Sequence, residues 1–276
     1  MPFSSDVLSL DVDGHVATLW LDRDAARNAL GRAAWQDLPR AAAAVAESDA
    51  RALVLAARGP YFTVGLDLKD LGGDLVGGFG GSAASPARAN ERRWQGVREM
   101  QAAVSSLAEL PIPVIAAVHG YCLGGGVDLI TACDIRLAAA DAVFSIRETK
   151  MAIVADLGTL QRLPRIIGAG HVAELAFTGR DIDAEEAARI GLVNRVAGST
   201  GSEVVAAATA LAREIASNSP MAVRGTKAVL RANDGRTVDE GLEFVARWNT
   251  LYLQSHDLSE AITAFLEKRS PTFRGE

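Results

Sequence analysis

The sequence contains few of the residues that form disulfides and metal sites. Only two cysteines, Cys122 and Cys133, and four histidines occur in 276 residues. If the segment between the cysteines is largely helical, they stand too far apart along its axis to form a disulfide. The histidines are scattered and show no ligand spacing. We therefore expect two buried thiols in a reducing compartment and no metal ion.

Basic residues are also in the minority, with 28 Lys and Arg against 34 Asp and Glu, a net charge of -6. This balance argues against nucleic acid as a main partner. No apolar run reaches membrane-spanning length, so we expect no membrane partner. Asp6 interrupts any signal-peptide pattern, and the ending from Arg274 to Glu276 differs from a Ser-Lys-Leu peroxisomal signal. These features predict a cytoplasmic protein.

The hydrophobic pattern alternates between helices and buried strands. Asp13 and Gly14 interrupt an alternating stretch and predict a hairpin of two strands. Further strands are predicted at 52–56, 114–118 and 141–146, and helices at 32–47, despite Pro39, and at 127–134. After Gly158 the pattern is almost wholly helical, with segments near 159–166, 170–178, 184–190, 203–217, 220–232, 236–254 and 258–268. We expect a core domain over residues 1–200 and a helical region over residues 201–276.

One segment, GGDLVGGFGGSAASPARAN at residues 72–90, breaks this order. It is rich in Gly, Ser and Ala and has no hydrophobic period. We interpret it as a flexible insertion, and the alternative is a lid that orders over a bound ligand.

Two glycine-containing segments could present main-chain amides to one ligand. RGPYFTVGLDL, residues 58–68, places Gly65 before Leu66 at a strand-to-helix passage, and GYCLGGGVDL, residues 120–129, places three glycines before a helix start. Helix starts gather unpaired N–H groups. Two such groups aimed at one carbonyl oxygen form an oxyanion hole and stabilise an enolate. Taken alone, each segment could be an ordinary glycine turn.

Three acids lie in apolar surroundings, where an ionised carboxylate is expensive to keep: Asp128, Glu148 and Asp156. Acids that share a cavity and cannot all be charged suit proton transfer between two positions of one substrate. Each acid also has a structural interpretation. Asp156 could cap the following helix, Asp128 could sit in the first turn of its helix, and Glu148 could pair with Arg147 or Lys150.

The segments FTVGLDL and HGYCLGGGVDLITACDIRLA resemble the two signature segments of the crotonase (enoyl-CoA hydratase/isomerase) superfamily. The similarity continues through SIRETKMAIVADLGTLQRLPRIIG to FTGRDIDAEEAARIGLVNRV. Within the superfamily, ETKMAIVADLGTLQRLP most closely resembles the delta-3,5-delta-2,4-dienoyl-CoA isomerases, which carry an additional acid where typical hydratases carry Gly. Here that acid is Asp156. The resemblance implies an α/β fold, a crotonase (ClpP-like) spiral of repeated ββα units with a C-terminal helical trimerisation region.

The resemblance also implies roles for individual residues. The amides of Leu66 and Gly125 correspond to the oxyanion hole for the thioester carbonyl. Glu148 corresponds to the acid near C2 of the substrate, Asp156 to the acid near C6, and Asp128 to a third pocket carboxylate, which is Glu in most hydratases. The residues implied to contact substrate or CoA are Arg27, Val64, Gly65, Leu66, Asp67, Leu68, Gly125, Phe265 and Lys268.

In the superfamily, the C-terminal segment that corresponds to Phe265 and Lys268 often reaches the CoA bound by an adjacent subunit. A solvated charge or a packed aromatic ring is the alternative for Arg27, Phe265 and Lys268. The resemblance further implies homotrimers, possibly paired into hexamers.

The activity implied is isomerisation of 3,5-dienoyl-CoA to 2,4-dienoyl-CoA in unsaturated fatty acid β-oxidation. In this hypothesis Glu148 removes a C2 proton and protonated Asp156 delivers one to C6. No metal or redox cofactor is expected, because backbone dipoles stabilise the dienolate, and CoA enters as part of the substrate. The alternatives are an enoyl-CoA hydratase using Asp128 and Glu148, and a relative that binds acyl-CoA or RNA without turning this substrate over.

Overall fold

The computed structural model describes residues 3–77 and 85–276, and of residues 74–77 only the backbone. Its centre is a six-stranded sheet in the order β1-β2-β3-β4-β6-β9, in which only the β1–β2 pair is antiparallel. The strands are β1 Leu8–Asp13, β2 Val16–Leu21, β3 Ala52–Ala57, β4 Val114–Val118, β6 Ile135–Ala138 and β9 Arg195–Val196. The predicted hairpin at Asp13 and Gly14 and the strands over 52–56 and 114–118 are confirmed.

A smaller sheet stands beside the first, in the order β5-β7-β8. It is formed by β5 Tyr121–Leu123, β7 Val143–Ser145 and β8 Ile182–Asp183. The predicted strand at 141–146 is confirmed as β7, although it is shorter. Because β5 follows β4 after only two residues, the chain passes directly from the large sheet to the small one at Gly120.

Helices cover both faces of the large sheet, because its strands bury alternate residues on opposite sides. On β3, Leu53 and Leu55 belong to the core shared with α1 (Arg32–Ala46) and α3 (Pro86–Glu109), whereas Val54 and Ala56 belong to the core shared with α8 (Gly201–Ala216). The helices are α1 Arg32–Ala46, α2 Leu68–Gly77, α3 Pro86–Glu109, α4 Gly125–Thr131, α5 Thr159–Arg162, α6 Ala169–Thr178, α7 Ala184–Arg189, α8 Gly201–Ala216, α9 Pro220–Ala232, α10 Val238–Tyr252 and α11 His256–Glu267. Three short 3-10 turns, η1 Asp24–Ala26, η2 Glu148–Met151 and η3 Leu163–Arg165, complete the described elements.

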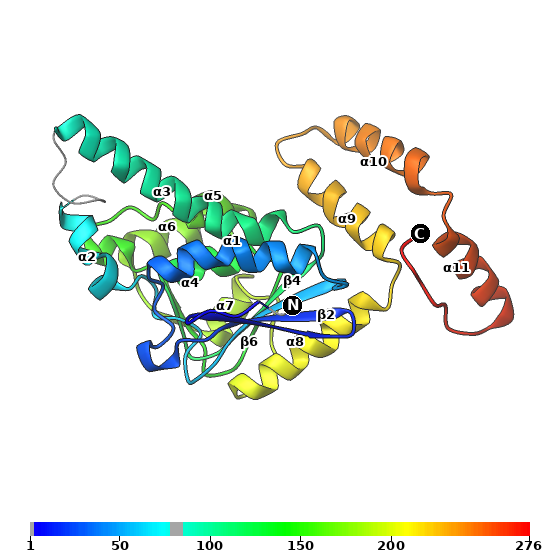
Figure 1. Cartoon of the computed structure of the whole chain (residues 1–276), viewed down its shortest axis with the longest axis horizontal. Helices are drawn as coiled ribbons and strands as arrows, with labels where there is room; N and C mark the ends of the chain where they lie inside the picture. Colours follow the sequence, from blue (N-terminus) through cyan, green and yellow to red (C-terminus); the bar gives the residue numbers. More distant parts are fainter. Residues whose placement is uncertain (1–2, 78–84) are drawn as a thin grey trace.

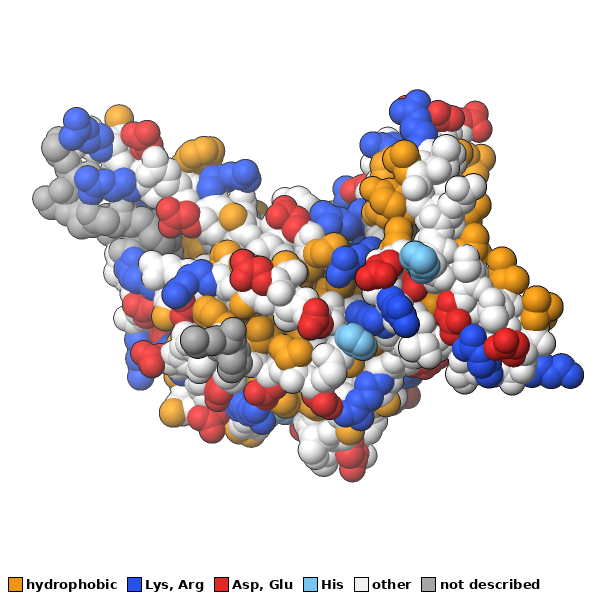
Figure 2. Space-filling view, turned by 45° about the vertical axis from the view of Figure 1, so that its right-hand side comes forward, with side chains coloured by type: hydrophobic (Ala, Val, Ile, Leu, Met, Phe, Trp, Pro, Cys, Tyr) orange, Lys and Arg blue, Asp and Glu red, His pale blue; other side chains and the backbone are white. Residues whose placement is uncertain are grey.

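The C-terminal helices α9, α10 and α11 stand away from this core (Figure 1). Large apolar side chains are exposed along them, including Leu251, which is 74% exposed, and Phe265, which is 82% exposed. Figure 2 shows hydrophobic side chains gathered on this part of the surface. By contrast, α8 packs against the large sheet through Val204, Ala208 and Ala212, so the projecting part begins at Pro220. The predicted domain boundary near residue 200 stays a prediction.

The expected flexible insertion over 72–90 is wrong in part. Residues 72–77 continue α2 and residues 86–90 begin α3, while residues 78–84 lie outside the described residues. The Gly-, Ser- and Ala-rich composition obscured a helix start in this segment. The Ser85 hydroxyl accepts the Arg88 N–H as the N-cap, and Pro86 is the first residue of the helix. Met100, Val104 and Leu107 then give α3 a buried face.

The α/β fold is confirmed, and the two cysteines are buried and unbridged as expected. Among the helices of the described chain, none has the length and apolar character needed to cross a membrane.

Candidate active site

A cavity of about 430 Å³ lies where the two signature segments meet. Residues 64–66 and 123–125 form one wall, and the acids Asp128, Glu148 and Asp156 line the same space. This size is typical of a pocket for a small molecule. The structure therefore brings together the predicted main-chain site and all three predicted acids.

The two glycine-containing segments touch through their backbones. Gly65 adopts φ +87°, and a Cβ placed on it would lie 2.7 Å from the carbonyl oxygen of Leu123 and 3.6 Å from the amide nitrogen of Gly125. Any side chain at position 65 would force the segments apart. Among the main-chain hydrogen bonds of the described turns and loops, none has the N–H of Leu66 or Gly125 as its donor. Both amides thus lie on the cavity wall and can donate to a ligand.

A buried polar frame holds these segments together. Thr63 donates its main-chain N–H to Tyr121 and accepts the N–H of Leu123, and its hydroxyl donates to the Asn28 carbonyl at 2.6 Å. The same hydroxyl accepts the Gly65 N–H at 3.1 Å. Because these hydrogen bonds join the backbones of the two segments, they set the separation of the Leu66 and Gly125 amides.

Asp128 is the most buried of the three acids, at 1% exposure, in the first turn of α4. Its Oδ1 accepts both the main-chain N–H of Thr159 at 2.6 Å and the Thr159 hydroxyl at 2.7 Å. Burial raises the pKa of Asp128 to about 6, and the two Thr159 hydrogen bonds oppose that rise. Asp128 therefore lies in the first turn of its helix, as its structural interpretation predicted, and its carboxylate also lines the cavity.

Glu148 follows β7 at the start of η2 and faces the glycine turn of the second segment. A Cβ on Gly124 would lie 3.4 Å from Oε1 of Glu148. Oε2 is buried without a hydrogen-bond partner among the described residues, and Arg147 pairs with Asp181 at 2.8 Å instead. Burial, and next the charge of Asp128, raise the pKa of Glu148 to about 7. The predicted alternative, a structural pair with Arg147 or Lys150, is not formed.

Asp156 lies in the loop between η2 and α5. Its residue as a whole is exposed, but partial burial of its carboxyl group in the cavity raises its pKa. The predicted alternative role as a helix cap is not formed, because Gly158 is the N-cap of α5 and the Thr159 amide is bonded to Asp128. The charge of Asp156 also raises the pKa values of Asp128 and Glu148, as expected for acids that share one space.

Five of the predicted binding residues besides Gly125 line the cavity: Arg27, Val64, Gly65, Leu66 and Leu68. Asp67 does not line it. Its carboxylate is bonded to Arg23 at 2.7 Å and accepts the N–H groups of Lys69 and Asp70 at the start of α2. The predicted place of Asp67 beside the substrate stays a prediction, and the bonds engage its side chain outside the cavity lining. The bond to Arg23 is the main cause that lowers the pKa of Asp67.

Phe265 and Lys268 belong to the end of α11 and are not part of this cavity within one chain. Their predicted contact with CoA depends on an adjacent subunit and stays a prediction.

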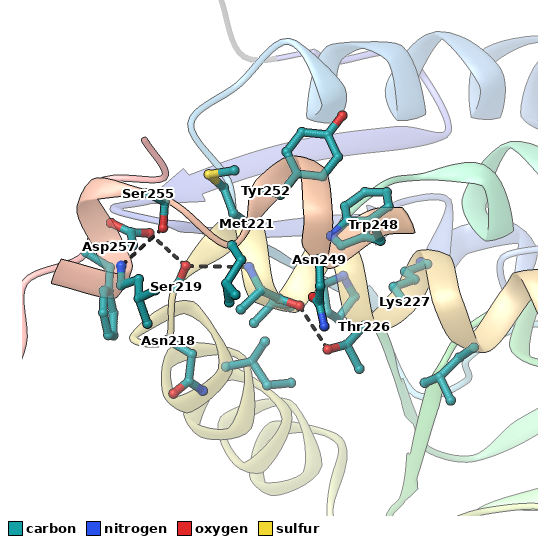
Figure 3. Close-up of a pocket in the computed structure, with 18 of the residues that line it drawn as sticks. Asn218, Ser219, Met221, Thr226, Lys227, Trp248, Asn249, Tyr252, Ser255 and Asp257 are labelled. Atoms are coloured by element: carbon teal, nitrogen blue, oxygen red, sulfur yellow. Dashed lines mark hydrogen bonds between the residues drawn. The ribbon is translucent and has the colours of Figure 1, made fainter. Parts of the chain in front are cut away.

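A larger cavity of about 900 Å³ lies between the core and the C-terminal helices. Trp248 and Tyr252 of α10 flank it (Figure 3). Its buried amine, Lys227, is already bonded to Asp134 at 2.6 Å. That buried amine thus has its counterion within the chain, whereas the smaller cavity holds the buried Oε2 of Glu148, which has no hydrogen-bond partner among the described residues, and the two amides of Leu66 and Gly125. The smaller cavity is the candidate active site.

Sequence reasoning did not identify Thr63, Tyr121, Arg147 or Thr159 as parts of the site. Thr159 follows Gly158 directly and could have been recognised as a donor at a helix start. Thr63 and Tyr121 are placed by the contact between the two segments, for which the sequence carries no local signal, and Arg147 directly precedes Glu148 as the N-cap of η2.

The family model "Enoyl-CoA hydratase/isomerase" matches residues 11–276. The "Delta(3,5)-Delta(2,4)-dienoyl-CoA isomerase, peroxisomal" of Arabidopsis thaliana is 42% identical over 269 residues, covering 97% of this chain and 96% of the relative. The mitochondrial protein of the same name from Dictyostelium discoideum is 45% identical, covering 83% and 76%. Among solved structures, an enoyl-CoA hydratase from Bacillus anthracis superposes with a TM-score of 0.87 at 33% identity, covering 98% of this chain and all of that one.

Proposed function

The chain belongs to the enoyl-CoA hydratase/isomerase family, and we propose that it converts 3,5-dienoyl-CoA to 2,4-dienoyl-CoA. The observation that carries this proposal is the third acid, Asp156, which lines the same cavity as Glu148 and Asp128. The names of the two isomerase relatives support the same activity.

The first step is removal of a proton from C2. The thioester carbonyl accepts hydrogen bonds from the amides of Leu66 and Gly125, so the negative charge that develops on its oxygen is stabilised. Glu148 takes the C2 proton. A carboxylate with a pKa of about 7 suits this role, because a general base is most effective when its pKa lies near the working pH.

The second step is delivery of a proton to C6. In this proposal Asp156 enters the step protonated and donates its proton to the far end of the dienolate, and the burial that raises its pKa favours the protonated form. The double bonds move from C3 and C5 to C2 and C4, and no atom is gained or lost. The chain is left with a proton on Glu148 and none on Asp156, and exchange with solvent restores the starting state. Asp128 keeps one neighbour protonated through like-charge repulsion.

The second candidate is an enoyl-CoA hydratase, favoured by the presence of Asp128 and Glu148 in one cavity and by the name of the Bacillus anthracis relative. A hydratase needs two acids and a water between them. It has no use for a third acid with a raised pKa, so Asp156 favours the isomerase.

The test is ultraviolet absorbance with 3,5-octadienoyl-CoA. Isomerisation brings both double bonds into conjugation with the thioester, hydration of an enoyl-CoA removes conjugation, and binding alone changes neither. We expect wild-type protein to isomerise the substrate and Glu148→Gln and Asp156→Asn to lose about 10²- to 10⁴-fold in kcat. Full activity in Asp156→Asn would leave this residue without a chemical role.

We further propose a homotrimer, or a hexamer made of two trimers. The support is the row of exposed apolar side chains on α10 and α11, since a soluble monomer rarely exposes so large an apolar patch. In such an assembly Phe265 and Lys268 of one subunit would reach the CoA bound by its neighbour. The cytoplasmic location and the absence of a cofactor stay predictions, and the two isomerase relatives are named peroxisomal and mitochondrial.

A further inference from the structure

The Asp156 carboxyl group has little of its own to hold it. Among the described residues, no side chain donates a hydrogen bond to it, and the segment between η2 and α5 has no regular structure. Its position must therefore be set by the main chain on either side. Ala155 and Leu157 are buried and fix the two flanks.

The carbonyl group of Asp156 is held by a side chain from α3. Gln101 donates from Nε2 to this oxygen at 2.6 Å, and its Oε1 accepts from Nη1 of Arg98 at 2.8 Å. A guanidinium group can only donate, so the amide oxygen of Gln101 must face Arg98 and its NH₂ group must face Asp156. Arg98 thus fixes which end of the amide meets the loop.

A second tie lies one helical turn further along α3. Arg162 donates to the hydroxyl of Ser105 at 2.9 Å and to the carbonyl of Leu157 at 3.3 Å. Gln101 and Ser105 are four residues apart and lie on the same face of the helix. Hydrogen bonds therefore connect two successive carbonyl groups of the loop, those of Asp156 and Leu157, to the same helix, directly through Gln101 and through Arg162 to Ser105.

The same helix also forms a wall of the cavity, through Val97 and Met100. The substrate and the loop that carries the second acid are thereby positioned against one helix. From this geometry we propose that Gln101 is a positioning residue, which holds the Asp156 carboxyl group at the distance needed to protonate C6. This inference rests on the proposed isomerase function.

The experiment compares Gln101→Met with Gln95→Met. Methionine matches glutamine in length and helix preference but cannot donate, and Gln95 is exposed on the same helix, so the control makes the identical change away from the loop. Both variants and wild type are given 3,5-octadienoyl-CoA in D₂O. Product formation and deuterium incorporation at C2 of recovered substrate are measured together.

Glu148 is held by η2 and not by α3, so removal of the C2 proton should continue in Gln101→Met while delivery to C6 fails. We expect kcat to fall about 10- to 100-fold with KM changed less than about threefold, because a displacement of about 1 Å can cost that much in rate. The ratio of C2 exchange to product should rise about tenfold or more. Gln95→Met should match wild type in both respects.

The proposal is overturned if Gln101→Met behaves as Gln95→Met, or if it loses C2 exchange in step with product. Gln101→Glu gives a second measurement, since it keeps the shape but replaces the donor by a carboxylate, and it should raise the exchange ratio as well. If wild type forms no 2,4-dienoyl product, the proposed function fails, and that result is distinct from a failure of the Gln101 proposal alone.

Discussion

Replacing Glu148 by Gln should make the protein more stable at alkaline pH, while it removes the proposed general base. The pKa of Glu148 rises from its ordinary 4.5 to about 7 in the folded protein, because its carboxyl group is buried and lies near Asp128. At a pH between these two pKa values, Glu148 has already lost its proton in the unfolded chain and still holds it in the folded chain. Stability from this group is therefore fully present below pH 4.5 and is lost as pH rises through 7.

The size of the effect follows from the two pKa values. The carboxyl group destabilises the fold by about 1 kcal/mol at pH ~5 and by about 3 kcal/mol at pH ~8.5, before water in the open cavity screens part of it. Glutamine has nearly the same shape and carries no charge. The stability advantage of Glu148→Gln over wild type should therefore grow by about 2 kcal/mol between these two pH values.

Urea unfolding at the two pH values and one fixed protein concentration measures this growth. Glu47→Gln, an exposed change at the end of α1, is the matched control and should show no such growth. A Glu148→Gln advantage that is the same at both pH values, or a variant that is less stable than wild type at pH ~8.5, would refute the claim that Glu148 is held in a raised-pKa state by burial.

Three further predictions follow from the contacts. Thr159→Val removes the hydroxyl donor to Asp128 and should raise the pKa of that acid above about 6, so it should destabilise the fold by about 1 to 2 kcal/mol at pH ~8 and by less at pH ~5, as measured by urea unfolding. Lys227→Met leaves Asp134, whose side chain is 34% exposed, without its cation and should lower the free energy of unfolding by about 1 to 3 kcal/mol in urea, because solvent screens part of the uncompensated charge; an unchanged free energy would show that the pair is dispensable. Leu251→Asp, on the exposed face of α10, should shift the mass measured by light scattering from trimer or hexamer to monomer, and an unchanged mass would exclude this face from the interface.

Much of the fold was predictable from local pattern. The hairpin at Asp13 and Gly14, the buried strands and the helical C-terminal third follow from hydrophobic period and turn residues, which are properties of short segments. The start of α3 was not predicted, because the glycine-rich composition of residues 72–90 obscured the helix cap at Ser85. The short strands β5, β6, β8 and β9 were also not predicted, since strands this short have their ends set by neighbours in the sheet.

The groups that could do the chemistry can be identified from the sequence: three acids in apolar surroundings and two glycine segments with room for a ligand near their amides. Which of these groups meet depends on the folded chain. It joined the segments through Thr63, engaged Asp67 with Arg23 away from the cavity, and tied the Asp156 loop to a helix 55 positions earlier through Gln101. Side-chain identity is local, but distance and desolvation depend on residues far apart in the chain, so the raised pKa values and the positions of the acids exist only in the folded molecule.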